Sequence, residues 1–435
     1  MCIGRGARGD RDGLTRRSLL HGTLIGSMVC HWLGDGTRLR AGQVRPAKRY
    51  DLLLKGGRVI DPSQDLSAPR DVAIVGHTIA RVAADIPEAD AGHVLDVGGS
   101  IVTPGLIDVH VHVYDGVAPL SIPADPNCVA KGVTTVIDAG SAGAHTFPGF
   151  RKYVVEVAQT RVRALLNISV VGQSTMSTDN PHGELLDLRY ANPSLAVRTI
   201  ERNRDVILGV KVRLSRDIAG ENDLKALHLA REAADAVKLP VMAHIGGTHT
   251  PLEDLLPVLR TGDVITHCFH GRDGGILDEK GRARPAVLAA VDRGVHLDVG
   301  HGAGSFVFDV AERALKQGLL PGTISSDLHQ FNIHGPVFDL ATTLSKFLHL
   351  GLTLEQVIAR VTTHPAKTFG FAGGLGTLRE GAEADVAVFS LREGDYTFID
   401  AMGGRRIGHR KLFPVATIKS GRLYGSATIP VPGSE

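Results

Sequence analysis

The chain has 435 residues, of which 43% are hydrophobic, 22% charged and 5% aromatic, with 48 Lys and Arg against 46 Asp and Glu. This composition excludes a disordered chain, which would be poorer in apolar residues, and a nucleic-acid binder, which would carry a strong basic excess. Four Cys exclude a disulfide-stapled miniprotein, and the sequence does not show the repeated apolar spans of a polytopic membrane protein. We therefore expect a large globular core.

The N-terminal segment differs in charge from the rest of the chain. Residues 1–50 hold ten Lys or Arg and three Asp, whereas the remainder holds 38 basic and 43 acidic residues. The sequence TRRSLL at 15–20 precedes a short apolar stretch ending near Cys30. This order is typical of an export signal rather than a spanning helix, and the Arg pair resembles a twin-arginine signal. A disordered basic tail and lipidation at Cys30 are the alternatives.

The export signal predicts the first segment of the chain and its destination. Residues 1–49 are expected to form the signal peptide and a linker. The twin-arginine export machinery would then be a partner, and the protein would be exported to a bacterial periplasm. Removal of the leader would leave two cysteines, Cys128 and Cys268, which do not make a disulfide framework.

The two ends of the remaining chain resemble each other. Residues 50–61 (YDLLLKGGRVID) and 384–391 (ADVAVFSL) both read as strands bounded by turn residues. Gly-Gly pairs and Pro punctuate these regions, as expected between short strands. We predict that residues 50–104 and 373–435 together form a small β-sandwich.

The long middle, residues 105–372, alternates short apolar runs with helical stretches. Eight runs stand at 105–113, 134–140, 163–172, 206–215, 239–247, 263–271, 295–302 and 322–329. Near-continuous apolar runs indicate parallel strands covered on both faces. Between them, Asn192 before Pro193 is a helix-start signal, and Leu224, Leu227, Ala230 and Ala234 form one apolar stripe. Eight such units predict an α/β (β/α)8 TIM barrel; a doubly wound open sheet is the alternative.

Polar residues with metal-binding chemistry fall at or near the ends of five of these runs. They are His110 and His112 on the first run, Lys211 on the fourth, His244 on the fifth, His267 on the sixth and Asp327 on the eighth. Side chains alternate along a strand, so the first two imidazoles share a face and can bind one ion. Each residue alone has a structural explanation, such as a hydrogen-bonded core His. Five strands supplying such groups at one end favour an active site there.

Several short sequence motifs resemble those of a known family. DVHVHV at 108–113, GVTTVIDAGSAGA at 132–144, THCFHG at 266–271 and THPAK at 363–367 resemble the amidohydrolase superfamily, and most closely its amidohydrolase/deacetylase metallohydrolases with a dihydroorotase-like binuclear centre. The resemblance covers about residues 50–425. No Cys stands among the matching ligand positions. Cys268 directly follows His267, so strand alternation directs its side chain toward the helices and away from the site. A D-aminoacylase-type centre is therefore not favoured.

The resemblance implies a site with two divalent metal ions. His110, His112 and Asp327 would bind one ion, His244 and His267 the other, and Lys211, carboxylated by CO₂, would bridge both. A metal-bridging hydroxide would attack a carbonyl, and Asp327 would be the catalytic proton shuttle. Zinc is the default metal, although manganese, iron and cobalt also accept these ligands.

Three further residues are candidates for substrate binding. Arg213 shares a strand face with Lys211 and would hold a substrate carboxylate or pair with a loop acid. His301 ends the seventh run and would contact substrate or cap the turn. His270 would contact substrate or replace His267 as a ligand.

The predicted function is hydrolysis of an amide or ester bond in a small molecule. We expect a deacetylase or deacylase of acylated amino or hydroxy acids. The alternatives are a cyclic amidase of the dihydroorotase or hydantoinase type and, from another class, a non-catalytic metal-binding barrel module. The expected partner is a small-molecule substrate and not a nucleic acid. The sequence leaves open whether the chain forms a homo-oligomer.

Overall fold

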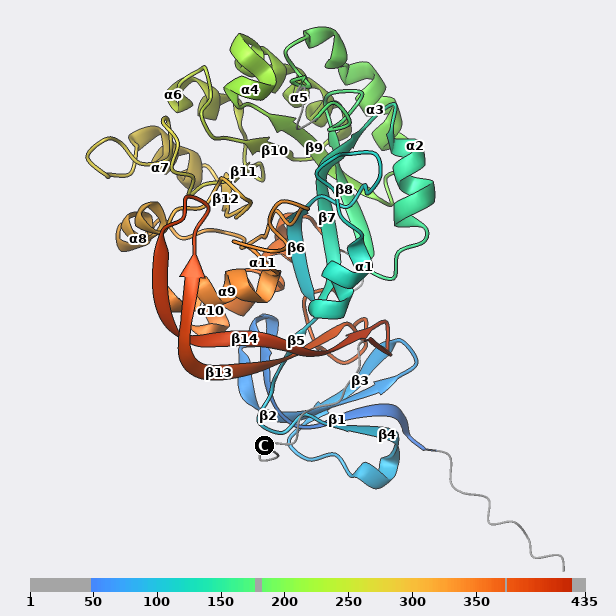
Figure 1. The fold of residues 1–435 in the computed structure, drawn as a ribbon. Helices are drawn as coiled ribbons and strands as arrows, with labels where there is room; N and C mark the ends of the chain where they lie inside the picture. The colour runs from blue at the N-terminus through green and yellow to red at the C-terminus, as the bar shows by residue number, and fades with distance from the viewer. Residues whose placement is uncertain (1–47, 177–181, 372–373, 425–435) are drawn as a thin grey trace, which may run out of the picture. The chain divides into compact units, whose positions relative to one another are not determined.

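The computed structural model describes residues 48–176, 182–371 and 374–424 (Figure 1). The predicted twin-arginine motif and Cys30 lie outside these ranges. The described residues belong to one compact unit, Lys48–Glu435. None of their helices combines the length and the apolar character needed to cross a bilayer.

The two ends of the chain meet in one eight-stranded sheet. Its strands are β1 (Tyr50–Asp61), β2 (Leu66–Val75), β3 (Thr78–Ala83), β4 (Ala91–Asp96), β5 (Ile101–Pro104), β13 (Val386–Ile399), β14 (Arg405–Lys419) and β15 (Arg422–Tyr424). The order is β15-β14-β13-β5-β1-β2-β3, with β4 also paired to β1. Antiparallel pairing of β13 with β5 sets Val388 opposite Val102 and joins the N- and C-terminal segments.

The expected β-sandwich is not confirmed, because the hydrogen bonds place all these strands in a single sheet. Apolar residues from both ends of the chain are nevertheless buried together. Leu54, Val59, Val72, Val102 and Val388 belong to one cluster and are fully buried. The sequence therefore identified strands at both ends of the chain, but not the number of layers that they form.

The middle of the chain forms a curled parallel sheet. Its strands are β6 (Leu106–Val111), β7 (Val133–Gly143), β8 (Arg161–Asn167), β9 (Ile207–Arg213), β10 (Val241–His244), β11 (Val264–Thr266) and β12 (His296–Asp298). They pair in sequence order, so all seven carboxyl ends lie at one edge. Parallel order throughout agrees with the near-continuous apolar runs, and the open-sheet alternative, whose strand order would reverse, is not met.

The eighth expected strand, at 322–329, is not a regular strand. Residues 323–328 instead make isolated parallel bridges on both sides, from Thr323 to Asp298 of β12 and from Leu328 to Val111 of β6. On the β6 side the Asp327 N–H donates to His110 O at 2.7 Å. This segment therefore links the two ends of the seven-stranded sheet and carries Asp327 beside β6.

Helices follow most of the parallel strands. They are α1 (Ala124–Asn127), α2 (Phe147–Phe150), α3 (Pro193–Glu201), α4 (Arg216–Ala219), α5 (Asp223–Val237), α6 (Leu252–Leu255), α7 (Pro285–Asp292), α8 (Phe308–Lys316), α9 (Leu340–His349), α10 (Leu354–Ala359) and α11 (Thr363–Thr368). Asn192 caps α3 by accepting from Leu195 N, as the sequence predicted. The stripe on α5 buries Leu227, Ala230 and Ala234.

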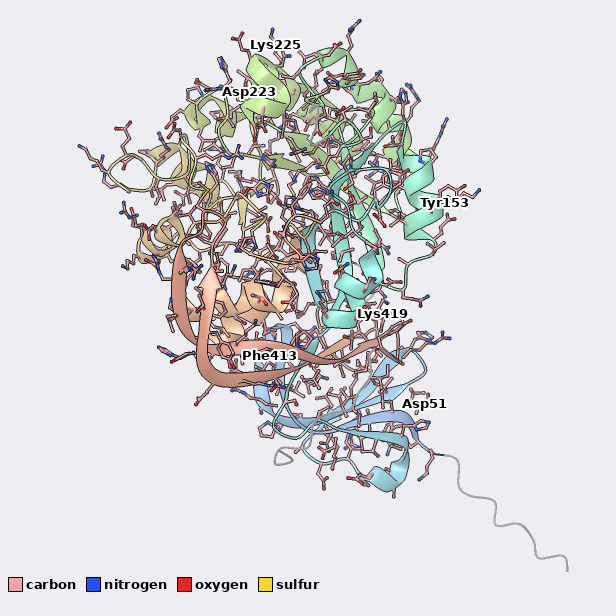
Figure 2. The ribbon with its side chains drawn as sticks, in the orientation of Figure 1. Asp51, Tyr153, Asp223, Lys225, Phe413 and Lys419 are labelled. Carbon is pink, nitrogen blue, oxygen red and sulfur yellow. The ribbon has the colours of Figure 1, made fainter. Side chains whose placement is uncertain are left out.

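Ion pairs tie the terminal sheet to the amino-terminal part of the parallel strands. Arg161, the first residue of β8, contacts Asp385 at 2.5 Å and Glu383 at 2.9 Å. Lys419, labelled in Figure 2, reaches Asp385 at 3.2 Å from β14. These ion pairs therefore fix the amino-terminal edge of the parallel sheet, and the loops at the opposite, carboxyl edge are available to form an active site.

Candidate metal centre

Three side chains converge between β6 and the segment 323–328. Asp327 Oδ1 lies 3.4 Å from His110 Nε2 and 3.2 Å from His112 Nε2. One ligand atom from each of the three residues fits within 4.8 Å of the others, and all three residues are buried. Asp327 Oδ1 has no hydrogen-bond partner among the described residues. Burial raises the pKa of Asp327 to about 6.

The imidazoles of His110 and His112 are neutral, and the Nδ1 atom of each lies within hydrogen-bond distance of a hydroxyl group. Burial lowers the pKa of His112 to about 3 and that of His110 well below its usual value. Thr266 Oγ1 donates to Asp298 at 2.7 Å, so it accepts from His110 Nδ1, which lies 2.8 Å away. The proton on Nδ1 leaves a lone pair on His110 Nε2, directed at the cluster.

A second pair of imidazoles lies at the ends of β10 and β11. His267 Nε2 is 2.9 Å from His244 Nδ1, and the His267 Nδ1–H donates to Gly300 O at 2.7 Å. That bond leaves the lone pair of His267 on Nε2. Burial lowers the pKa of both residues well below the usual value. His267 and His110 are also neighbours, with ring centroids 4.9 Å apart.

Lys211 is fully buried on β9, which lies between β6 and β10 in the sheet order. Its register partners are Asn167 on β8 and Met242 on β10. The only acceptor found for Nζ within the described chain is Met242 Sδ at 3.5 Å. Burial lowers the pKa of Lys211 to about 7. Gly140 leaves room for this side chain, because a Cβ there would lie 2.7 Å from Lys211 Cγ.

Two of these polar residues adopt the left-handed backbone conformation. His267 has φ 69° and Asp327 has φ 48°. Non-glycine residues rarely adopt positive φ, and such strain concentrates at functional sites. Gly302 packs against Asp327, since a Cβ there would lie 2.4 Å from Asp327 Oδ2. The surrounding fold therefore holds both side chains in positions that local preferences disfavour.

This donor set fits a divalent metal ion. The four imidazoles are neutral, and hydrogen bonds place free lone pairs on at least two of them. The carboxylate oxygen beside two of them is buried without a hydrogen-bond partner within the described ranges. His nitrogen and carboxylate oxygen are ligands that zinc and similar ions accept. A cation between these groups would satisfy the Asp327 oxygen.

Comparison with known proteins agrees with this geometry. The family model for the amidohydrolase family matches residues 101–421. The chain belongs to the amidohydrolase family.

The relatives of this amidohydrolase are hydrolases with different names. A protein of Enterococcus faecalis named a deacetylase is 36% identical over 378 residues, covering 86% of this chain and 99% of that one. A solved structure described as an adenine deaminase has a TM-score of 0.80 at 36% identity and covers 86% of this chain and 100% of its own. One described as a dihydroorotase has a TM-score of 0.77 at 32% identity, with coverages of 86% and 99%. The chain is therefore a hydrolase, and the alternative of a non-catalytic module is not retained.

The three predicted substrate residues of the amidohydrolase have different surroundings. Arg213 pairs with the buried Glu184 at 3.2 Å, which is the ion-pair alternative. His301 uses both ring nitrogens within the chain, on Gly302 O and Lys346 Nζ, so the structure does not bring it to the ligands. His270 is buried, and its Nδ1 accepts from Arg272 N. His267, not His270, faces His244.

Several site residues escaped the sequence analysis. Asp298 accepts hydrogen bonds from the hydroxyls of Thr266, Thr323 and Ser325. Asp108 accepts from Ser326, next to Asp327, and its pKa rises to about 7 through burial. Asp108 stands two residues before His110, so strand alternation was an available signal. These carboxylates position the residues that face the centre.

A second fully buried lysine, Lys346 on α9, differs from Lys211 in its partners. Its Nζ lies 2.7 Å from His301 Nε2 and donates to Pro336 O at 2.9 Å and Ile399 O at 2.7 Å. Burial lowers the pKa of Lys346 to about 7 as well. Lys346 thus joins the loop after β12, which packs on Asp327, to the end of β13.

The two lysines should respond oppositely to substitution by Met in metal-free protein. Lys346→Met leaves three buried acceptors unsatisfied and should lower the free energy of unfolding by about 2–4 kcal/mol. Lys211→Met loses only a sulfur contact and removes a buried cation. Because folding lowers the pKa of Lys211 from 10.5 to about 7, the wild-type protein loses stability as pH falls between these values. Lys211→Met should therefore gain stability relative to wild type from pH 10 to pH 7. Lys346→Met should show the same trend, because the pKa of Lys346 is also lowered to about 7, so the contrast between the two variants is their difference in the free energy of unfolding at one pH.

Urea unfolding of both variants at several pH values, after chelator treatment, measures this contrast. An equal decrease in the free energy of unfolding in both variants would contradict the prediction, because the hydrogen bonds of Lys346 would then contribute no extra stability.

Proposed function

We propose that this amidohydrolase is a binuclear deacylase that releases the acyl group from acylated amino or hydroxy acids. The observation that carries the proposal is the convergence of His110, His112 and Asp327 on one side and of His244 and His267 on the other, with Lys211 fully buried on β9, which lies between β6 and β10 in the sheet order. The deacetylase name of a relative that aligns over nearly its whole length supports the substrate class. Similarity of fold alone would not support a substrate class.

The residues present would hold two divalent ions, with zinc as the default. His110, His112 and Asp327 would hold one and His244 and His267 the other, and Lys211 in its carboxylated form would bridge them. When bound, such ions polarise a carbonyl and lower the pKa of water. The unprotonated amine is the form that reacts with CO₂, and the lowered pKa of Lys211 makes that form available near neutral pH.

The chain itself supplies proton transfer and orientation. Asp327 accepts the proton of the attacking water and gives it to the leaving nitrogen or oxygen. The hydrogen bond from His110 Nδ1 to Thr266, which in turn donates to Asp298, keeps the His110 ring fixed while this proton moves. In this proposal the segment 323–328 takes the part of the eighth strand of a (β/α)8 barrel, and its bridges to β12 and β6, which hold Asp327 beside β6, support that role.

We further propose export to the periplasm by the twin-arginine machinery. The support is the TRRSLL sequence at 15–20 and the basic excess of residues 1–50.

A turnover screen tests the function. The protein is loaded with Zn²⁺ in bicarbonate and offered D and L forms of N-acyl amino acids and O-acyl hydroxy acids, with dihydroorotate and hydantoins beside them. We expect hydrolysis of the acyl acids, abolished by chelation. Turnover of the cyclic amides alone would support the second candidate, which the structural likeness to a dihydroorotase favours. Loaded protein that hydrolyses none of these compounds would refute both.

A further inference from the structure

A pocket of about 390 Å³ opens between the loop after β11 and helix α8. Residues 270–279 form one wall, and Arg284 and Arg313 contribute to the rest. The wall begins three residues after His267, and the His270 N–H donates to His267 O at 3.2 Å. The pocket is therefore continuous through the backbone with a proposed metal ligand.

His270 presents an unused donor in this pocket. The residue is 2% exposed, and its Nε2 is buried without a partner in the described chain. Its Nδ1 accepts a hydrogen bond from Arg272 N at 3.1 Å, so Nδ1 carries no proton and the ring proton stands on Nε2. A buried N–H without an acceptor is unfavourable and uncommon in folded proteins. A ligand oxygen would satisfy it.

A glycine packs beside the edge of the imidazole. A Cβ on Gly275 would lie 3.4 Å from His270 Cε1 and 3.7 Å from Nε2. Gly275 and His270 line the same pocket, and the buried Nε2–H edge of the ring lies directly beside Gly275. A larger residue at 275 would cover the donor.

Arg272 links this pocket to the metal centre. Its side chain lies beside the loop after β10, where a Cβ on Gly247 would be 3.5 Å from Arg272 Cδ. Within the described ranges its guanidinium has no ion-pair partner, in contrast to Arg213, which Glu184 engages.

The other charges of the pocket are mixed. Asp278 is paired with Arg282, Asp309 with Arg406 and Arg284 with Glu253. Arg313 lines the pocket on α8, and the acids Asp273 and Glu279 line it in exposed positions. Net charge therefore does not select a ligand, whereas the buried N–H of His270 requires an acceptor and the exposed, unpaired guanidinium of Arg272 can donate to the same ligand.

We propose that His270 Nε2 and the Arg272 guanidinium bind the carboxylate of the substrate's amino or hydroxy acid portion. The pocket is then the subsite that selects acids over neutral amides. This inference rests on the proposed function, because it assigns the acid end of the same substrate. A carboxylate supplies oxygens for both donors, and hydrogen bonds to a charged partner are stronger than those to a neutral one.

A specificity ratio tests the assignment. The ratio compares kcat/KM for N-acetylalanine with that for N-acetylalaninamide, in metal-loaded full-length protein. His270→Leu should lower this ratio by about 10- to 100-fold through KM, because one charge-assisted hydrogen bond is lost. His270→Gln keeps an N–H near the Nε2 position and should retain the ratio within about threefold. His249→Leu, in a neighbouring pocket, is the matched control.

Binding separates this inference from the proposed function. Calorimetry with lactate and lactamide needs no turnover. Tighter binding of lactate that His270→Leu abolishes and His270→Gln preserves would support the subsite even if no acyl acid were hydrolysed. Hydrolysis of acyl acids with an unchanged ratio in His270→Leu, or equal losses on acid and amide, would overturn the subsite and leave the deacylase proposal standing.

Discussion

Replacement of Asp327 by Asn is expected to lower kcat by about 10³- to 10⁴-fold and to leave the protein folded with most of its metal. The Asn side chain has nearly the same shape and keeps an oxygen that faces His110 and His112. It lacks the basic carboxylate that takes a proton from water. The loss should therefore fall on kcat rather than on KM.

Three measurements separate chemistry from structure in this variant. Metal content reports ligand loss, the free energy of unfolding reports folding, and kcat reports proton transfer. The matched control is Asp115→Asn, the same change at an exposed acid on the loop after β6, and it should keep wild-type kcat. If Asp327→Asn kept kcat within tenfold of wild type with full metal content, Asp327 would not be the proton acceptor.

The positions of the ligand-type residues were predictable because they depend on simple periodicities. Alternation along a strand put His110 and His112 on one face, and parallel order brings the carboxyl ends of successive strands to one edge. The structure places these residues, with His244 and His267, at that edge. Neither inference required knowledge of which loops lie nearby.

The exact backbone at the centre was not predictable in the same way. His267 and Asp327 take positive φ, which no local sequence preference favours. Asp327 is held by its N–H bond to His110 O and by close packing of Gly302, and both contacts join segments far apart in the chain. The same long-range constraint explains why 323–328 makes isolated bridges instead of a regular strand.

The partners of buried charges also depend on tertiary structure. Arg213 was predicted as a carboxylate binder or an ion-pair partner, and only the fold brings Glu184 to it. His301 was placed at the end of its strand, but α9 supplies Lys346 to its ring. Likewise, turn residues around apolar segments identified strands at both chain ends, but the pairing of these strands into one sheet rests on contacts such as Val388 with Val102.

Lys211→Gln is expected to lose one of two bound metal ions and to lower kcat/KM by about 10³-fold or more. Among the six ligand-type residues, Asp327 is the only carboxylate, and the four imidazoles are neutral. Two dications would leave a large uncompensated charge in a buried site, which is strongly unfavourable. A carboxylated Lys211 supplies the missing negative charge, whereas the Gln amide cannot acquire it.

The carboxylation itself is tested on wild-type protein loaded in bicarbonate or in CO₂-depleted buffer. Two metal equivalents and the added mass of one CO₂ should appear together in native mass spectra, and only with bicarbonate. Lys211→Glu carries a carboxylate on a shorter side chain and should recover part of the second metal equivalent without bicarbonate. Two equivalents bound to Lys211→Gln, or an unmodified lysine in fully loaded wild-type protein, would contradict the bridging role, because the second cation would then be held without the charge that Lys211 is proposed to provide.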